Sequence, residues 1–321
     1  MKKSIIAIAV SSAALASVSV QAAEGSTVDV YGNIQYAYTD ADAGTDFVDN
    51  GSTIGLKGET KINDDLTAFF KYELEFDADE KDSAVDAGLD QAFVGLKGNF
   101  GKAQVGSFDT IYNNAIQDSV DQFEYLGMSN AAKTSEGDTV AYFSPSISGF
   151  EVQVAAQVKG DVVDSSGTKV NSYDGTSVMA VVKYSTGIVS VALGYDAREN
   201  TADTEATTGL AVTVTPMDNF SVTAKYETTD GDTATDTDGN SIGNDTYGLA
   251  ARYGYGAGDV YASYQNVDPA LAGTADYNEY AAGVTYSLAS NIYVYGEVGK
   301  YENATNNDTD TQTAVGVYYG F

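Results

Sequence analysis

The chain has no cysteine, no histidine and no tryptophan, and it has only 3 prolines in 321 residues. Without cysteine there is no disulfide framework and no thiolate chemistry. Without histidine the chain lacks both the usual general base and the commonest metal ligand of proteins. Hydrolases of the Ser/His type and metalloproteases with an HExxH motif are therefore excluded. An enzyme built on this chain would have to use carboxylate, lysine or tyrosine side chains.

Positive charge is also scarce, since 16 Lys and Arg stand against 46 Asp and Glu, for a formal net charge of −30 at pH 7. A nucleic-acid partner needs a basic surface, so this balance argues against one. An acidic surface attracts cations instead. What the chain does have is 24 Tyr, 12 Phe and 33 Gly, a composition that with so little proline is typical of continuous β-structure.

The first 22 residues have the pattern of a secretory signal peptide. Lys2 and Lys3 precede an apolar run from Ile5 to Val20, and small residues follow it. The run is short, Ser-rich and without a cationic stop, which favours a cleaved signal over an N-terminal membrane anchor. We therefore expect cleavage after Ala22, export, and one domain over residues 23–321.

From Thr27 onward apolar and polar side chains alternate, which predicts strands with one oily and one wet face. In the first strand Ile34 and Tyr38 lie on the oily face, and Asn33 and Gln35 lie on the wet face. Short connections alternate with long ones, which predicts sixteen strands. The short ones are near Asn63, Phe100, Ser148, Thr186, Met217, Ala257 and Ala289, and the long ones are near 41–50, 78–86, 107–137, 160–174, 199–206, 230–244, 268–276 and 303–310.

Tilted strands of roughly ten residues can cross a hydrocarbon layer about 30 Å thick. Backbone groups in a bilayer must all be paired, so such a sheet must close on itself. Aromatic residues on the oily face gather toward strand ends, as in the aromatic girdles of outer-membrane barrels. We therefore expect an all-β, transmembrane antiparallel barrel of sixteen strands. A large exported β-sandwich, solenoid or adhesin is the alternative, and the absence of an internal repeat of fixed period weighs against the repetitive forms.

The longest interruption of the alternation runs from Ser107 to Gly137. A structureless insert of this length is unusual in a compact domain and is commonly functional. It carries an acidic set with aromatic residues between its members: Asp109, Asp118, Asp121 and Glu124. We interpret the insert as a segment that narrows a pore.

Three sequence blocks resemble the general trimeric porins of the Gram-negative outer membrane. They are VDVYGNI at 28–34, GLKGETKINDDLTAFFKYE at 55–73 and AFVGLKGNFGKAQVGSFD at 92–109, and the terminal Phe321 is a further shared feature. The resemblance implies a homotrimer in outer-membrane lipid and lipopolysaccharide, with short periplasmic turns, long extracellular loops and a water-filled pore for passive diffusion of small hydrophilic solutes and ions.

The resemblance also implies roles for particular residues. The third long loop would fold into the lumen, and the segment FEYLG at 123–127 would place Glu124 at the constriction. The last strand, with Tyr319 and Phe321 on its oily face, would be the signal that the barrel-assembly machinery recognises.

The family faces its third loop with basic residues on the opposite wall, and here this chain departs from the pattern. Asn33, Thr53, Asp90 and either Ser135 or Lys133 stand where relatives often carry Lys or Arg. Other cations on the predicted wet face either replace that cluster or are ordinary lumen charge: Lys57, Lys71, Lys225 and Arg252. The inward aim of Asp90 rests on the resemblance alone. Because rings of acidic side chains favour cations, we expect a cation-preferring pore with these wall residues.

No cofactor is expected. Residues 232–245 resemble a calcium loop at Asp236, Asp238 and Asp245, but Ala234 stands at the first ligand position and the terminal Glu is missing. A hydrophilic surface loop is the favoured interpretation. Divalent ions that bridge acidic loops to lipopolysaccharide phosphates are a better candidate for metal binding than a specific site.

Other functions stay open at this stage. A substrate-specific channel would use lumen tyrosines such as Tyr261, Tyr293 and Tyr295. A structural or adhesive barrel would have a lumen plugged by the long loop. An outer-membrane enzyme based on a carboxylate pair such as Glu73 and Glu75 is disfavoured, because spacing alone does not distinguish that pair from a wet wall lined with acids.

Overall fold

The computed structural model describes residues 18–19, 26–79, 87–129, 135–158, 161–163, 169–172, 176–198, 206–230, 243–270, 275–303 and 308–321. Most of the predicted signal peptide lies outside these residues, so its cleavage stays a prediction. No helix in the described part of the chain is long and apolar enough to cross a membrane.

The described elements are almost all strands. They are β1 (Val18–Ser19), β2 (Ser26–Ala41), β3 (Gly44–Asp49), β4 (Ser52–Lys61), β5 (Leu66–Phe76), β6 (Ala87–Gly98), β7 (Gly101–Asp109), α1 (Ile111–Ala115), β8 (Ser135–Phe143), β9 (Phe150–Val158), β10 (Asp161–Val163), β11 (Lys169–Ser172), β12 (Thr176–Thr186), β13 (Val189–Asp196), β14 (Thr207–Met217), β15 (Phe220–Thr229), β16 (Asn244–Gly254), β17 (Asp259–Pro269), β18 (Tyr277–Ala289), β19 (Ile292–Glu302) and β20 (Thr309–Gly320).

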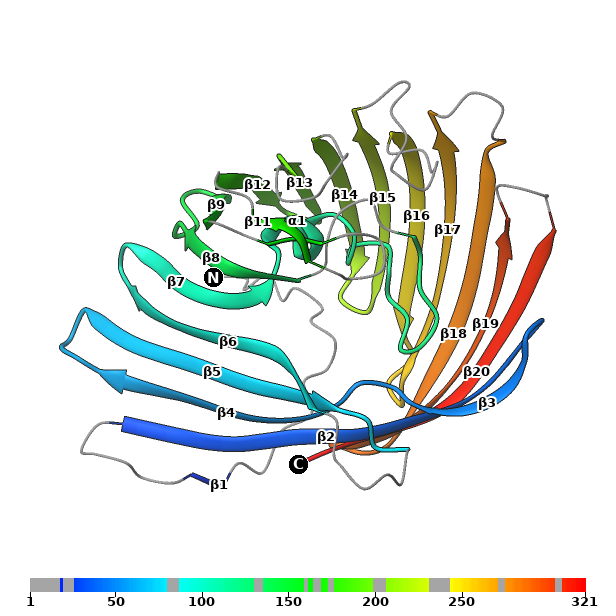
Figure 1. Cartoon of the computed structure of the whole chain (residues 1–321), viewed down its shortest axis with the longest axis horizontal. Helices are drawn as coiled ribbons and strands as arrows, with labels where there is room; N and C mark the ends of the chain where they lie inside the picture. The colour runs from blue at the N-terminus through cyan, green and yellow to red at the C-terminus, as the bar shows by residue number, and fades with distance from the viewer. Residues whose placement is uncertain are drawn as a thin grey trace.

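The main sheet closes on itself. From β4 to β20 successive strands of the ring pair antiparallel, with β9 next to β12, because β10 and β11 form a separate two-stranded sheet. Strand β20 pairs with both β19 and β2, with Val317 opposite Tyr36. Figure 1 shows β20, in red, beside the blue β2. The ring has sixteen strands when β3 and β4 are counted as one, because both pair with the same edge of β2 and only residues 50–51 separate them. The sixteen-strand antiparallel barrel is confirmed.

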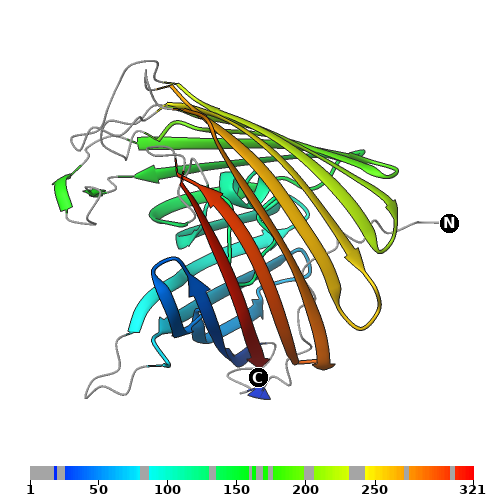
Figure 2. The ribbon, with the colours of Figure 1, turned by 90° about the vertical axis from the view of Figure 1, so that its right-hand side faces the viewer.

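The connections lie where the alternation predicts them, but the first, third and fourth long connections contain regular structure. Short turns join β4 to β5, β6 to β7, β8 to β9, β12 to β13, β14 to β15, β16 to β17 and β18 to β19. At the turn between β12 and β13, Gly187 has φ of +58°, a left-handed conformation that favours glycine. The first long connection was wrong in part: residues 44–49 form strand β3, an extension of the second barrel strand. Figure 2 shows the strands running tilted between the two rims.

Exposure alternates along the strands in the sense that a membrane barrel requires. Val94 is 58 % exposed and Val315 is 64 % exposed on the outer face, whereas Ala37, Gln104 and Ala314 face inward and are buried. Apolar side chains outside and polar or small side chains inside are the reverse of a soluble sandwich. The outer face can therefore meet lipid while every strand edge is paired.

The long insert is shorter and more ordered than its sequence indicates. Strand β7 continues to Asp109 and β8 begins at Ser135, so the connection is residues 110–134, of which 110–129 are described. We call residues 110–129 the inner loop. It begins with the short helix α1, whose N-cap Thr110 accepts a hydrogen bond from the backbone N–H of Asn113 at 3.1 Å. The prediction of a structureless insert was therefore wrong for this part.

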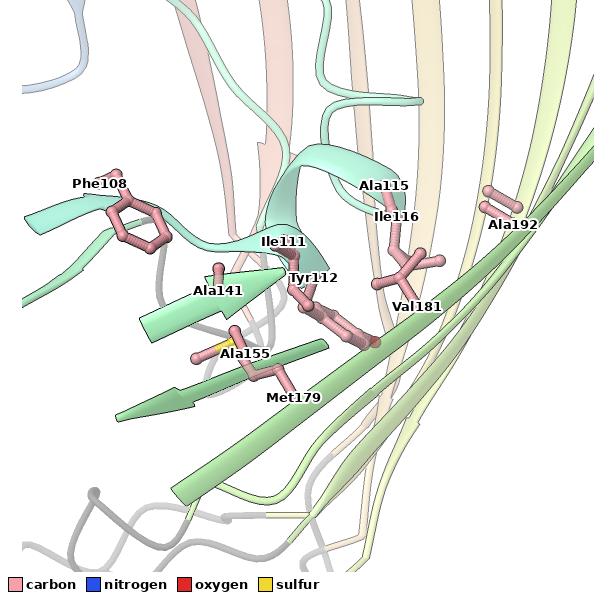
Figure 3. Packing of buried hydrophobic residues seen from close by; sticks show 11 residues of the cluster. Phe108, Ile111, Tyr112, Ala115, Ile116, Ala141, Ala155, Met179, Val181 and Ala192 are labelled. Atoms are coloured by element: carbon pink, nitrogen blue, oxygen red, sulfur yellow. The ribbon is translucent and has the colours of Figure 1, made fainter. Parts of the chain in front are cut away.

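Helix α1 lies inside the ring of strands, against its inner face (Figure 1). Figure 3 shows Tyr112 and Ile116 of the inner loop pointing toward β12, where Val181 is buried. The inner loop can pack this closely against the wall because the wall residues there are small. A Cβ at Gly209 on β14 would lie 2.5 Å from the Tyr112 hydroxyl and 2.6 Å from Ile116, closer than packed atoms allow.

Candidate pore and its inner loop

A buried ion pair on β15 holds the first half of the inner loop. Lys225 and Glu227 lie 3.1 Å apart, with side chains 0 % and 1 % exposed. The Tyr112 hydroxyl donates to Glu227 at 2.9 Å, and Lys225 donates to the side-chain oxygen of Gln117 at 2.5 Å. Gln117 then donates to the carbonyl of Met128 at 2.9 Å, which ties the two arms of the loop together. Both charges are thus paired and hydrogen-bonded, as burial requires.

The tip of the inner loop is held by one wall carboxylate. Glu297 on β19 accepts hydrogen bonds from the backbone N–H groups of Glu124, Tyr125 and Leu126 at 2.7, 3.0 and 2.8 Å. It also accepts one from the Tyr261 hydroxyl at 2.6 Å. Three consecutive N–H groups that converge on one carboxylate form a charge-assisted cradle, which fixes the position of the backbone more firmly than neutral partners do.

The far end of the inner loop is held in the same way. Glu279 on β18 accepts hydrogen bonds from the backbone N–H and the hydroxyl of Ser129 at 2.9 and 2.5 Å. Gln265 donates to the Ser129 carbonyl at 2.6 Å, and Ser263 donates to the Val120 carbonyl at 2.5 Å. The loop is therefore fastened to the wall over β15, β17, β18 and β19.

These three anchoring carboxylates, Glu227, Glu279 and Glu297, are functional residues that sequence reasoning missed. The only signal in the sequence is that each occupies a wet-face position of its strand. Nothing there shows that loop backbone will cover it.

The four acids predicted at the constriction each have a hydrogen-bond partner. Asp109, at the end of β7, accepts from Gln91 at 2.9 Å. Within the inner loop, Asp118 accepts from the side chain of Asn113 at 2.7 Å and Asp121 accepts from the backbone N–H of Met128 at 3.2 Å. Glu124 reaches the wall, where it accepts from the Tyr293 hydroxyl at 2.7 Å.

The loop acids have unusual protonation behaviour. Desolvation inside the barrel raises the pKa of Asp118 to about 6, and the charges of Asp109 and Asp121 add to that shift. Burial likewise raises the pKa of Asp121 to about 6, against the opposing effect of the backbone N–H groups that it accepts from. Burial also raises the pKa of Glu124 above its ordinary value, while the Tyr293 hydroxyl opposes the shift.

Two of the predicted wall cations lie away from the anchored side of the loop. Lys57 and Lys71 stand over the Tyr31 ring, with their Nζ atoms 4.8 and 5.9 Å from its centroid. Lys71 forms an ion pair with Glu73 at 2.6 Å and donates to Gln91 at 3.1 Å. Through Gln91 this cation is connected to the acid at the start of the loop.

A β-bulge turns Asp90 toward the lumen. In the pairing of β5 with β6, Gln91 stands opposite Glu73 and Leu89 stands opposite Leu74, which leaves Asp90 as the extra residue. The side chain of Asp90 hydrogen-bonds with the inward carboxyl of Glu73. A bulge changes the alternation locally, which is why the sequence alone did not decide where Asp90 points.

The other two predicted wall cations hold the loop. Lys225 is buried in the anchor on β15. Arg252 pairs with Asp259 at 3.2 Å, lies 4.8 Å over the Tyr261 ring and donates to the Gln122 carbonyl at 3.3 Å. Both side chains therefore face inward, but they contact the loop rather than an open passage.

Two of the positions that lack the family's basic residues, Asn33 and Thr53, contact each other. Asn33 donates to the Thr53 hydroxyl at 2.8 Å. Ser135 pairs with Asp109 in the sheet, and Lys133 lies outside the described residues. Inward lysines that sequence reasoning did not single out occur elsewhere: Lys97, Lys102 and Lys183. Of these, Lys102 lies 3.9 Å over the ring of Phe143.

The last strand ends in register with the first. The Phe321 backbone N–H donates to the Gly32 carbonyl at 3.0 Å, and the Phe321 carbonyl accepts from the Gly32 N–H at 3.1 Å. Tyr319 is 46 % exposed on the outer face and Phe321 is 39 % exposed. Their role as an assembly signal stays a prediction. The candidate calcium loop, residues 232–245, lies almost wholly outside the described residues. Within the described residues, no group of three or more acidic side chains is placed to hold a metal ion.

A closed membrane barrel with a loop fastened inside it defines a class of protein, the outer-membrane channels. The Gram-negative porin family matches residues 4–319, and the chain belongs to this family. It is 34 % identical over 100 % of both chains to a monosaccharide porin of a Halomonas species and to the major outer membrane protein of Halomonas elongata.

Solved structures share the fold. The anion-selective porin of Comamonas acidovorans has a TM-score of 0.73 at 20 % identity, covering 92 % of this chain and 100 % of that one. The Salmonella typhi OmpF complex with daunomycin has a TM-score of 0.73 at 21 % identity, covering 93 % and 98 %. The protein is thus an outer-membrane diffusion pore and not an enzyme.

Proposed function

We propose that this porin is a cation-preferring pore for small hydrophilic solutes and ions, narrowed by the inner loop. The observation that carries the proposal is the attachment of the loop to most of the wall but not to β4 to β7. Its anchors lie on β15 to β19, and α1 packs toward β12. At the tip, Tyr125 packs beside Ala37 of β2 and Ala314 of β20, and the Glu124 carbonyl accepts a hydrogen bond from Asn50, between β3 and β4, at 2.7 Å. The passage therefore runs between the loop and the wall formed by β4 to β7.

The charges along that passage are mostly negative. The loop contributes Asp118, Asp121 and Glu124, and the wall contributes Asp109, Glu73 and Asp90. The inward cations on this part of the wall are Lys57 and Lys71 near the loop and Lys97 and Lys102 near the short turn between β6 and β7. Lys225 and Arg252 are engaged with the loop. Acidic side chains around a narrow passage favour cations over anions.

The likeness to an anion-selective porin does not oppose this proposal, because at 20 % identity it concerns the fold alone. Ion preference depends on the charges that line a pore, and folds carry many different linings. The proposal is tested by the reversal potential of single channels in a planar bilayer under a KCl gradient. We expect the sign that K⁺ permeation gives, and the sign for Cl⁻ would contradict the proposal.

A monosaccharide-selective channel is the second candidate, since a relative of 34 % identity carries that description. On the inner wall Tyr293 and Tyr318 stack with ring centroids 4.8 Å apart, and the Tyr293 hydroxyl is bonded to Glu124. An aromatic face beside a carboxylate suits a sugar ring. The other lumen tyrosines considered for this role, Tyr261 and Tyr295, are 3 % exposed and lie beneath the loop.

Liposome swelling distinguishes these functions. A non-specific pore gives rates that follow solute size alone, whereas a sugar channel favours monosaccharides over other solutes of equal size. A structural or adhesive barrel with a plugged lumen gives no swelling with any solute.

We also infer that the protein is a homotrimer, as the family resemblance implies. The outer face of the early strands has an apolar depression of about 540 Å³ around small residues, including Gly58, Ala68 and Ala103, which would allow a second copy to approach closely. Three equal conductance steps per insertion would support the trimer, and single steps would oppose it. Lipopolysaccharide and the assembly machinery remain expected partners.

A further inference from the structure

Charge is distributed unequally along the axis of the barrel. Inward carboxylates occur close to the strand ends that carry the long connections: Glu75, Asp90, Asp109, Asp196, Glu279 and Asp310. Arg198 lies beside Asp196, and Glu227 is compensated by its ion pair with Lys225. This end of the passage is strongly acidic.

The end with the short turns is close to neutral. Lys97 and Lys102 face each other across β6 and β7, beside the turn that joins these strands. Lys97 forms an ion pair with Glu59, while Lys102 lies over Phe143.

The remaining inward charges near the short turns also balance one another. They are the cations Lys61, Lys183 and Arg252 and the acids Asp29, Glu151 and Asp259. Acids and bases therefore offset one another at this end, in contrast to the long-connection end.

A pore with one acidic end and one balanced end conducts differently in the two directions. In the acidic part cations carry most of the current, whereas in the balanced part both ions carry it. A voltage that drives cations from the acidic part toward the balanced part delivers salt to the junction faster than it is removed, so ions accumulate and conductance rises. The opposite voltage depletes the junction.

We propose that this porin rectifies, with larger current when the long-connection side is positive. The inference rests on the proposed cation preference of the pore. It assigns a role to Lys97 and Lys102, which keep the short-turn end from becoming acidic as well.

The test is the current through single oriented channels at equal voltages of opposite sign. Orientation is read with a Thr45→Cys variant, because the chain has no other cysteine and Thr45 is exposed on the long-connection side. A membrane-impermeant thiol reagent added to one side then identifies the side that this residue faces. The ratio of the current with the long-connection side positive to the current with that side negative should exceed one at about 0.1 M KCl. It should fall to one at about 1 M KCl, because the screening length then decreases from about 10 Å to about 3 Å.

Two double variants each remove charge from one end of the pore. The double variant K97Q/K102Q leaves the short-turn end acidic, and E75Q/D310N makes the long-connection end less acidic, so both should move the ratio toward one. The matched control is K300Q, since Lys300 stands opposite the outward Tyr280 and contributes nothing to the lumen. Its ratio should equal that of the unmodified protein.

Equal currents at low salt in an oriented channel would overturn the inference, as would a larger current at the opposite polarity. If the reversal potential still shows cation preference in that case, the proposed function stands and only the rectification fails. A reversal potential of the Cl⁻ sign would remove the basis of both.

Discussion

The change Glu297→Gln tests whether the inner loop depends on its wall carboxylates. In the folded protein this carboxylate accepts hydrogen bonds from the N–H groups of Glu124, Tyr125 and Leu126 and from the Tyr261 hydroxyl. A glutamine keeps the size of the side chain, but its amide has one acceptor oxygen, and its NH₂ group faces donors.

Hydrogen bonds to a charged group contribute about 1.5–3 kcal/mol each, so losing two of them weakens tip docking by about 3–6 kcal/mol. A loss of about 3 kcal/mol corresponds to a change of roughly 150-fold in the equilibrium between docked and released tip. The anchors at Glu227 and Glu279 remain, so the barrel and the ends of the loop should stay in place.

Two measurements report the release. Open-channel current noise should increase as the tip moves in the passage, and the amide hydrogens of residues 124–126 should exchange faster. Glu75→Gln removes the same charge from an inward position near the end of β5, away from the backbone N–H groups that Glu297 holds, and it serves as the matched control. Unchanged noise and exchange in Glu297→Gln would refute the view that this carboxylate holds the tip.

Three further predictions concern the loop and its acids. Gly209→Ala should destabilise the barrel by about 1–3 kcal/mol, because the new Cβ meets Tyr112; the temperature at which the folded band is lost on an unheated gel measures this. Cation preference should weaken as pH falls through about 6, because Asp118 and Asp121 then take up protons and lose their charge; reversal potentials across a pH series measure this. Glu124→Gln should change both conductance and selectivity, and if single-channel recordings show neither change, that carboxylate does not lie at the constriction.

The barrel could be predicted from the sequence because its physical cause is local. A strand that separates lipid from water must alternate, and Ile34 and Tyr38 on the outer face show the period directly. The extension of the second strand was missed because residues 44–49 contain Asp46 and Asp49, which are typical of loops. Pairing with β2 outweighs that local preference.

The docking of the inner loop could not be predicted in this way. Glu279 and Glu297 look like any acid on a wet wall, since their partners are backbone N–H groups more than a hundred residues away in the chain. Asp90 was equally undetermined, because a bulge shifts the alternation and no composition signal marks it. The acids of the inner loop can be identified in the sequence. The contacts of Lys225 and Arg252 with the loop depend on the folded structure and could not be predicted.

The most direct test of the cation preference is the ratio of K⁺ to Cl⁻ permeability, obtained from the reversal potential of the unmodified protein under a KCl gradient at neutral pH. We expect a K⁺ to Cl⁻ permeability ratio above one, because the loop carries the acids Asp118, Asp121 and Glu124. The ratio should fall toward one in the triple variant D118N/D121N/E124Q. A ratio below one in the unmodified protein, or a ratio that the triple change leaves as it was, would contradict the assignment of ion preference to these loop acids.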